Sequence, residues 1–392
     1  MRFDVVVIGG GAAGITVAAR LRRAGVTDLA IVEPSPVHHY QPLWTLVGGG
    51  LADVRRSVLS MADVMPKGTH WIRASASGID PERDSVLLED GRRIGYRVLI
   101  MASGIHLDWH RIPGLPEAVA RGRVCSVYRS DLAQRTWHDI VTLREGTAVF
   151  TVPPGPVKCA SAGQKIAYLA CDYWRREGRE VQVHLVLPGA RSFYYPEYAD
   201  ILDAAIDRWG IVCHLASEVS EVDGAGGKIA VRDAEGFERR IPCDLLHVVP
   251  PQSAPDWVAA SPLARTGAGA GGFVEVDRHT LQHSRFPKVF AIGDVAGTPN
   301  VKTGAAIRKQ APVVVRNALA ALSGLPPQAS YHGYTCCPMV TSRNQLLLAE
   351  LDYEGPVRRP IPGWPRQVID PHLWTKRYGL PLLYRLMLQG RA

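Results

Sequence analysis

Short runs of apolar residues alternate with amphipathic segments along much of the chain. Residues 3–8 and 98–104 are almost continuously apolar, which is typical of parallel strands that are buried on both faces of a sheet. Residues 12–24 have helical spacing of apolar positions, and residues 29–33 form the next expected strand. This order of strand, helix and strand predicts an α/β fold with a parallel sheet.

The same alternation returns beyond residues 113–116, whose prolines and glycine indicate a domain boundary. We expect a second Rossmann-like unit made of helices at residues 131–143 and from just after Cys159 to 176, and strands at residues 148–152, 181–187 and 245–249.

A glycine-rich linker at residues 267–272 precedes two more expected strands, at residues 273–277 and 289–294, and a helix over 303–322. We expect these elements to rejoin the first unit, which makes it discontinuous. The predicted division is 1–112 and 266–330 for the first Rossmann-like domain, 113–265 for the second, and 331–392 for a small C-terminal region.

Composition narrows the class of protein. The 392 residues are 46% hydrophobic, enough for two or three domains with cores, and the formal charge is 45 − 37 = +8. That charge suits an anionic cofactor, substrate or lipid surface, but no basic run with interleaved aromatic residues indicates nucleic acid. The N-terminus begins directly with a strand and no apolar run is long enough to span a bilayer, so we expect a chain that folds in a bacterial cytoplasm.

The chain has seven cysteines, and this odd number does not indicate a disulfide scaffold. No Cys-x-x-Cys or Cys/His spacing predicts a metal site. Cys171, Cys213 and Cys243 stand in apolar helix or strand contexts and are interpreted as buried core thiols. Cys159 lies just before a helix with Lys158 and Lys165 nearby, which favours the thiolate.

A dinucleotide-binding turn follows the first strand. Gly9, Gly11 and Gly14 have the spacing that permits a tight turn and the close approach of a pyrophosphate to a helix N-terminus. Glu33 lies 33 − 14 = 19 residues beyond Gly14 and closes the next strand, where an acid accepts hydrogen bonds from a ribose.

A second signature indicates which dinucleotide binds. Gly293 and Asp294 end a strand shortly before Lys302 and Thr303, so the Asp can bind the ribityl chain of FAD while a helix start and a lysine lie near the flavin. Here the chain resembles the glutathione-reductase-like flavoproteins with two dinucleotide domains. The resemblance implies an FAD site formed by Gly9, Gly11, Ala12, Ala13, Gly14, Glu33, Gln41, Ala102, Ser103, Gly104, Gly293, Asp294, Lys302, Thr303 and Gly304.

The second unit lacks the glycines that would bind a nicotinamide dinucleotide. Its first strand is followed by Pro153, Pro154 and Pro156, and prolines lack the N–H groups that a pyrophosphate needs. We interpret this turn as a lost nicotinamide site with Cys159 in its place.

Four longer motifs are similar to those of the sulfide:quinone oxidoreductases, in the branch that includes the mitochondrial enzyme. They are residues 39–48, the segment around Cys159, residues 246–251 and the segment from Cys337 to Thr341. The resemblance implies that Cys159 and Cys337 form a disulfide or sulfur-bridged pair beside the flavin. Hydrosulfide then makes a persulfide on one sulfur, and the other thiolate, assigned to Cys159, adds to the flavin and passes two electrons.

The resemblance also implies the partners. These are sulfide, ubiquinone or menaquinone, a small sulfur acceptor (glutathione, coenzyme A, sulfite or a second sulfide) and a membrane surface; a homo-oligomer is left open. Cys125, Cys336 and Lys165 are candidates for an assisting role, with structural roles as the alternative. Gln164 and Lys165 either orient the acceptor or lie on a solvated helix face.

The segment at residues 374–388 is short, basic, aromatic and apolar on one side. It fits either a segment in a membrane interface or a helix docked on the protein's own core. The resemblance favours peripheral, monotopic attachment to the cytoplasmic side of a bacterial inner membrane, with a quinone channel lined in part by this tail. His38 and His39 are expected to pack in a loop near the adenine ribose.

Three other functions remain open at this point. One is an NADH:quinone oxidoreductase of similar fold, which the missing second glycine turn opposes. Another is a sulfide dehydrogenase that reduces a cytochrome. The last is a non-catalytic flavoprotein that senses persulfides.

Overall fold

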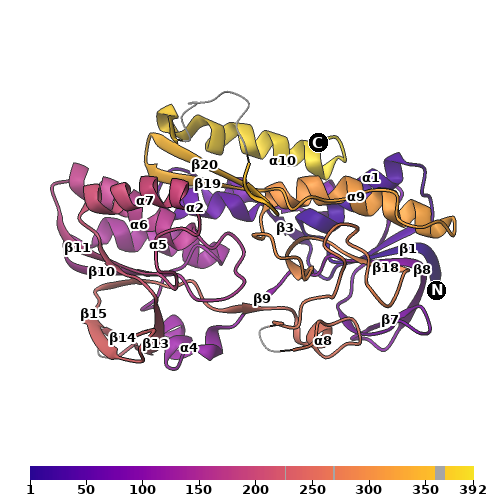
Figure 1. The fold of residues 1–392 in the computed structure, drawn as a ribbon, viewed down its shortest axis with the longest axis horizontal. Coiled ribbons are helices and arrows are strands. Elements are labelled where there is room, and N and C mark those ends of the chain that lie inside the picture. The colour runs from indigo at the N-terminus through magenta and orange to yellow at the C-terminus, as the bar shows by residue number, and fades with distance from the viewer. Residues whose placement is uncertain (226, 268–269, 358–366) are drawn as a thin grey trace.

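The computed structural model describes residues 1–225, 227–267, 270–357 and 367–392, without the side chains of Gln367 and His372. Two α/β units lie side by side, and the C-terminal strands and helix α10 extend across both of them (Figure 1). The mixed α/β fold expected from the sequence is confirmed.

The first sheet has the order β5-β2-β1-β8-β7-β6, and β18 also pairs with β8. The pairs that join β5, β2, β1, β8 and β18 are parallel, whereas β6 and β7 are antiparallel additions. The bounds are β1 Arg2–Ile8, β2 Leu29–Val32, β5 His70–Ile72, β6 Ala76–Asp80, β7 Ser85–Leu88, β8 Arg93–Met101 and β18 Val289–Ala291. The late strand β18 thus lies in the first sheet, while the predicted domain boundaries stay a prediction.

The second sheet has the order β12-β11-β10-β16, and all its pairs are parallel. An antiparallel sheet β13-β14-β15 lies beyond it (Figure 1). The bounds are β10 Glu145–Thr151, β11 Glu180–Val186, β12 Val212–His214, β13 Ser217–Asp223, β14 Lys228–Asp233, β15 Glu238–Pro242 and β16 Leu245–His247.

The C-terminal region forms a third, antiparallel sheet. Strand β19 (Thr335–Ser342) pairs with β20 (Gln345–Asp352), which also pairs with β21 (Gly355–Pro356) and β22 (Gln367–Ile369). Two short pairs complete the sheets, β3 (Val37–His39) with β4 (Val58–Ser60) and β9 (His106–Leu107) with β17 (Gln252–Ser253).

The helices cover the sheets and carry much of the chemistry. Their bounds are α1 Ala12–Arg23, α2 Trp44–Gly48, α3 Met61–Val64, α4 Leu115–Ala120, α5 Ser130–Thr142, α6 Ala162–Arg176, α7 Pro196–Trp209, α8 Asp256–Ala259, α9 Gly304–Leu322 and α10 Leu380–Leu388. Helix α9 packs on α1, as does α10, and α6 packs on β19. The C-terminal region therefore contacts both α/β units.

One expected strand does not form. Over residues 273–277 the structure has only isolated bridges, from Val274 to Ala264 and to Ala296. Gly271 and Gly272 precede this stretch with φ of +61° and +68°. Asp277 follows it, and its carboxylate accepts hydrogen bonds from backbone N–H groups of a turn. The apolar pattern correctly indicated buried residues. The turns on both sides of residues 273–277, however, prevent them from pairing along their length as a strand.

Candidate active site

A strained loop presents Cys159. The loop follows β10 and ends where α6 begins at Ala162. Cys159 has φ of +44°, a left-handed conformation that is uncommon for residues other than glycine. Its backbone N–H donates to the Lys302 carbonyl at 2.9 Å, and the Tyr128 hydroxyl lies 2.8 Å from its carbonyl oxygen. These bonds compensate for the strain and fix the direction of the thiol.

Strand β19 carries the second cysteine. Successive side chains of a strand point to opposite faces, so Cys337 is buried against the second α/β unit and Cys336 lies on the other face, half-buried. The Sγ atoms of Cys159 and Cys337 are 3.9 Å apart across 178 residues of sequence. The fold therefore brings the two predicted cysteines into contact.

Lys165 lies between the two sulfurs. It is in the first turns of α6, only 1% exposed, and its Nζ is 3.1 Å from Cys159 Sγ and 3.2 Å from Cys337 Sγ. Of the two alternatives for Gln164 and Lys165, the solvated helix face is wrong, because Gln164 is also buried and donates to the Tyr168 hydroxyl at 2.8 Å. Helix α6 turns this face toward the core and the pair.

Charge and hydrogen bonding make the two thiols unequal. A hydrogen bond from Cys337 lowers the pKa of Cys159 well below its usual value, against the opposing effect of burial, and the charges of Lys165 and Lys376 add to the shift. The same hydrogen bond, followed by burial, raises the pKa of Cys337. Burial lowers the pKa of Lys165, but the two sulfurs outweigh it, and the net shift is upward. Cys159 is the thiolate of the pair and Cys337 the thiol.

A second lysine that acts on the sulfur pair comes from the tail. Lys376 is buried within the π-helical turn Thr375–Gly379, and π-turns are frequent at functional sites. Burial and the neighbouring charge of Lys165 lower its pKa to about 7, while the two cysteines act in the other direction. The sequence reasoning missed this residue, since the only signal was a lysine in a segment interpreted as membrane-facing.

The glycine turn has the shape that a dinucleotide needs. Gly9 has φ of +102°, and a Cβ on Gly14 would lie 1.9 Å from the Gly9 carbonyl oxygen. A Cβ on Gly11 would meet nothing within 4 Å, and no side chain caps the N-terminus of α1, where Ala12 and Ala13 follow. Open space therefore faces the N–H groups of a helix start, which suits a pyrophosphate.

The rest of the predicted FAD site lies around this turn. Glu33 accepts from Gly10 N at 2.7 Å, which holds its carboxylate beside the turn. Ser103, between Ala102 and Gly104, has a buried Oγ without a hydrogen-bond partner, and the space beyond Gly104 is open. An orphaned hydroxyl next to open space fits a polar cofactor.

The structure shows the contacts of the side chains near Asp294, which the sequence alone did not give. Lys302 is buried, its Nζ donates to the Ala296 carbonyl at 2.9 Å and lies over the Phe273 ring, and burial lowers its pKa to about 8. Thr303 caps α9 by accepting from Ala306 N, and a Cβ on Gly304 would meet nothing within 4 Å. The buried Gly293 has φ of +72°, which favours glycine there.

Gln41 joins the cofactor and cysteine segments. Its side chain is exposed, and its Oε1 accepts from Lys158 Nζ at 2.8 Å. The Lys158 backbone N–H donates to Gln252 Oε1 at 2.9 Å. The Lys158 ammonium thus bonds Gln41, whereas the Lys165 ammonium bonds both sulfurs.

The remaining cysteines lie elsewhere. Cys125 is fully buried, and its backbone forms an isolated β-bridge with that of His247. Burial raises the pKa of the Cys125 thiol to about 12, which disfavours a reactive thiolate. Cys171 is buried as predicted, but Cys213 and Cys243 are only partly buried, so the core interpretation was wrong for them. Both lie at the margins of their sheets, where solvent reaches one side.

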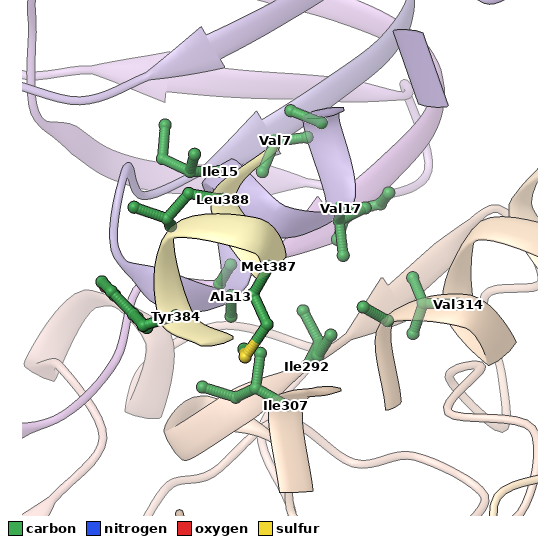
Figure 2. Packing of buried hydrophobic residues seen from close by; sticks show 14 of the residues in the cluster. Val7, Ala13, Ile15, Val17, Ile292, Ile307, Val314, Tyr384, Met387 and Leu388 are labelled. Atoms are coloured by element: carbon green, nitrogen blue, oxygen red, sulfur yellow. The ribbon is translucent and has the colours of Figure 1, made fainter. Parts of the chain in front are cut away.

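The tail is both docked and exposed. Figure 2 shows Tyr384, Met387 and Leu388 of α10 against α1 and α9, and all three are buried. The Tyr384 hydroxyl lies 2.5 Å from His38 Nε2, and His38 Nδ1 lies 2.9 Å from the Gly10 carbonyl. His38 therefore lies buried in strand β3 and links helix α10 to the glycine turn, so the expected packing in a loop is wrong. In contrast, the apolar side chains of Ile369, Trp374, Tyr378 and Leu382 in the C-terminal region are exposed.

A cavity of about 290 Å³ opens beside Cys337. Its lining includes Ser161 and Gln164 from the start of α6, and Arg191 and Tyr194 from the loop before α7. Arg191 is paired with Asp200 and Asp203 at 2.7 Å, so its charge is balanced at the mouth. Within the described ranges, no helix is long and apolar enough to cross a membrane.

Comparisons with known proteins identify a family and similar relatives. The model of the pyridine nucleotide-disulphide oxidoreductase family matches residues 3–320. The chain is 38% identical to the mitochondrial sulfide:quinone oxidoreductase of Mus musculus over 99% of its length and 87% of that protein, and 38% identical to that of Dictyostelium discoideum over 99% and 86%. The solved structure of the sulfide:quinone oxidoreductase from Aquifex aeolicus superimposes with a TM-score of 0.81 at 19% identity, covering 98% of this chain and 91% of that one.

Proposed function

Because the chain belongs to the sulfide:quinone oxidoreductases, within the pyridine nucleotide-disulphide oxidoreductase family, we propose that Cys159 and Cys337 carry out its FAD-dependent oxidation of sulfide. The observation that supports this assignment is the contact of the two sulfurs, 3.9 Å apart, with Lys165 Nζ within 3.2 Å of both. The enzyme oxidises sulfide, and quinone takes the electrons.

The two cysteines divide the chemistry. Hydrosulfide attacks the Cys337 sulfur of the oxidised pair, which forms a persulfide on Cys337, breaks the S–S bond and releases the Cys159 thiolate. Lys165 stabilises the negative charge that appears on Cys159, because its buried ammonium is 3.1 Å away. When bound, FAD accepts the two electrons that are released as the pair is reoxidised, and passes them to quinone.

Residues of this chain are suited to hold FAD. The backbone N–H groups after Gly11 would hold the pyrophosphate, the Glu33 carboxylate beside the turn would bind the ribose, and the Ser103 hydroxyl has no hydrogen-bond partner among the described residues. Asp294 and the N-terminus of α9 lie at the flavin end in this proposal.

The sulfane sulfur leaves through the cavity beside Cys337. A thiolate of glutathione or coenzyme A, sulfite, or a second sulfide attacks the outer sulfur of the Cys337 persulfide, forms the new S–S bond and leaves Cys337 as a thiolate. The cavity reaches Cys337 but not Cys159 among its lining residues, which supports Cys337 as the sulfur carrier.

Family membership favours this activity over the alternatives that the sequence left open. An NADH:quinone oxidoreductase needs a second pyrophosphate turn, and the loop after β10 has Pro153, Pro154 and Pro156 there. A persulfide sensor needs no cavity for a sulfur acceptor, and the cavity at Cys337 supports turnover.

Peripheral attachment to the cytoplasmic side of a bacterial inner membrane completes the proposal. The exposed apolar side chains of Trp374, Tyr378 and Leu382 lie on the same tail that carries Lys376 to the sulfur pair. A quinone from the membrane, ubiquinone or menaquinone, would then enter beside this tail. A homo-oligomer is compatible with this arrangement.

The test is anaerobic mixing of the FAD-loaded protein with sulfide and then with a short-chain ubiquinone, while flavin absorbance is followed. Sulfide should bleach the flavin and quinone should restore it. Cys159→Ser and Cys337→Ser should each abolish bleaching, whereas Cys213→Ser, which removes a thiol outside the pair, should not. Bleaching by NADH and not by sulfide would refute the proposal.

A further inference from the structure

A cluster of arginines lies beside the exposed apolar residues of the tail. Arg176 of α6 and Arg343, in the turn between β19 and β20, line a cavity of about 260 Å³ together with Ile369 and Pro371. Arg377 belongs to the tail, and its backbone carbonyl accepts from Arg56 at 3.0 Å. Four guanidinium groups from distant parts of the sequence thus gather on one side of the molecule.

Few carboxylates balance these charges. Asp172 pairs with Arg176 Nε at 3.0 Å and also accepts from the Arg343 backbone N–H at 2.6 Å. Asp370 is buried and accepts from the Thr375 backbone N–H. Asp53 also acts on Arg56, but it is paired with Arg55. Among the described residues, the four arginines therefore keep an excess of positive charge over Asp172 and Asp370.

The guanidinium groups of Arg343 and Arg377 are poorly satisfied. The Nε atoms of both are buried without a hydrogen-bond partner. Among the described residues, the Arg343 guanidinium donates to the Gly49 carbonyl at 3.0 Å and lies over the Trp137 and Tyr173 rings. Burial lowers the pKa of Arg343, and the charges of Arg176 and Arg377 lower it further, against the effect of Asp172. Because the positive charges of Arg176 and Arg377 act unfavourably on the Arg343 guanidinium, an anion bound among the three would be stabilised.

Apolar side chains mark what kind of anion fits. Ile369 is 75% exposed at the rim of the cavity, and Trp374 and Leu382 are each 62% exposed on the adjoining tail. A soluble anion would need the arginines only. A phospholipid needs both features, a guanidinium fork for its phosphate and apolar groups that enter the acyl boundary.

We propose that this cavity binds the phosphate headgroup of an anionic phospholipid at the membrane face of the enzyme. The inference rests on the membrane attachment proposed above and adds a defined lipid class and site to it. Arg176 and Arg343, which line the cavity, contact the phosphate, and Arg377 adds its charge from the adjoining tail. Trp374 and Leu382 enter the lipid beside it. Because the tail also carries Lys376, the bound lipid holds the segment that completes the sulfur site.

The test measures binding of the FAD-loaded protein to sedimented vesicles of phosphatidylcholine, with and without 30 mol% phosphatidylglycerol. The double variant R176Q/R377Q should lose about 30-fold in its preference for the anionic vesicles, since each basic residue near such a surface contributes about one kcal/mol. R121Q/R123Q is the matched control. It removes the same charge from exposed positions near α4, on the opposite side of the molecule from α10 (Figure 1), and should change the preference less than about twofold.

The outcomes separate this inference from membrane attachment itself. Leu382→Ser should weaken binding to both kinds of vesicle equally. Equal binding of the unaltered protein to both kinds, or equal losses in the two double variants, would overturn the headgroup site and leave attachment intact. No binding to any vesicle would overturn both. Micromolar binding of inorganic phosphate without vesicles would assign the cavity to a soluble anion and would also overturn the inference.

Discussion

Lys165 Nζ lies 3.1 Å from Cys159 Sγ and 3.2 Å from Cys337 Sγ, in a pocket where the lysine is 1% exposed. One buried cation therefore serves two sulfurs. Since Cys337 already donates to Cys159, the lysine reinforces an existing asymmetry between the thiols, and the proton of the pair stays on Cys337. A persulfide on Cys337 and a thiolate on Cys159 would both benefit from the same charge.

Replacing this lysine should impair the pair without breaking the fold. In Lys165→Met the pKa of Cys159 should rise, because an attractive charge is lost, so the pH midpoint for alkylation of Cys159 should move to higher pH. The rate of flavin reduction by sulfide at pH 7 should fall on the order of 100-fold. Mass spectrometry after iodoacetamide pulses gives the midpoint, and stopped flow gives the rate.

Lys158→Met is the control for that experiment, because Lys158 Nζ bonds Gln41 rather than either sulfur. It should move the alkylation midpoint of Cys159 much less than Lys165→Met does, because Lys165 bonds the sulfur directly. If Lys165→Met and Lys158→Met shifted the midpoint equally, the effect would be one of overall charge, and the specific role of Lys165 would be lost.

Lys376 should make stability depend on pH. Its folded pKa is about 7 against an ordinary 10.5, so between these values the unfolded chain binds more protons and stability rises with pH. Lys376→Met should therefore stabilise the apoprotein at pH 7, by up to about 4 kcal/mol, with a gain that shrinks toward pH 10. Urea unfolding of both proteins at pH 7 and pH 9.5 measures this difference. A gain that is the same at both values would contradict the buried-lysine explanation.

The sequence was most informative where steric limits on the backbone require a particular residue. The spacing of Gly9, Gly11 and Gly14 predicted the turn and α1, because steric clash leaves few alternatives: a Cβ on Gly14 would lie 1.9 Å from a carbonyl oxygen. The pairing of Cys159 with Cys337 came from the resemblance of their motifs. Nothing local in the chain states that a loop and a strand 178 residues apart will meet.

What the sequence could not give was the direction of long side chains. Lys158 and Lys165 looked equivalent beside Cys159, yet helix geometry turns only Lys165 inward. Lys376 was missed for the same reason, since basic and aromatic residues adjoin it in the sequence and the π-turn determines which side chain enters the core. The strand predicted at residues 273–277 is absent because an apolar run indicates burial and does not by itself indicate pairing with another strand.

The hydrogen bond between Tyr384 and His38 should couple the tail to the cofactor turn. Tyr384→Phe leaves the buried His38 Nε2 without its partner, which should cost about 1–2 kcal/mol of stability. Because His38 also contacts the Gly10 carbonyl, the affinity for FAD should fall too. Urea unfolding and fluorescence titration with FAD measure the two effects. Tyr378→Phe, at an exposed position of the same tail, should change neither, and equal effects from both variants would argue against the coupling.

Gly11 should matter for FAD and hardly at all for the fold. Its φ of −72° and ψ of −172° are open to alanine, and a Cβ there would meet nothing within 4 Å. Gly11→Ala should therefore fold with an unchanged melting temperature as apoprotein. Its methyl group would stand where the pyrophosphate approaches α1, so FAD affinity should fall about tenfold or more, a loss of about 1.4 kcal/mol or more.

Gly14→Ala should instead prevent normal folding, because its Cβ strikes the Gly9 carbonyl. Gly78→Ala, whose Cβ makes an ordinary 3.7 Å contact in β6, should change neither property. Calorimetry of the apoproteins and titration with FAD separate these cases; a Gly11→Ala protein that binds FAD normally would show that the pyrophosphate lies elsewhere.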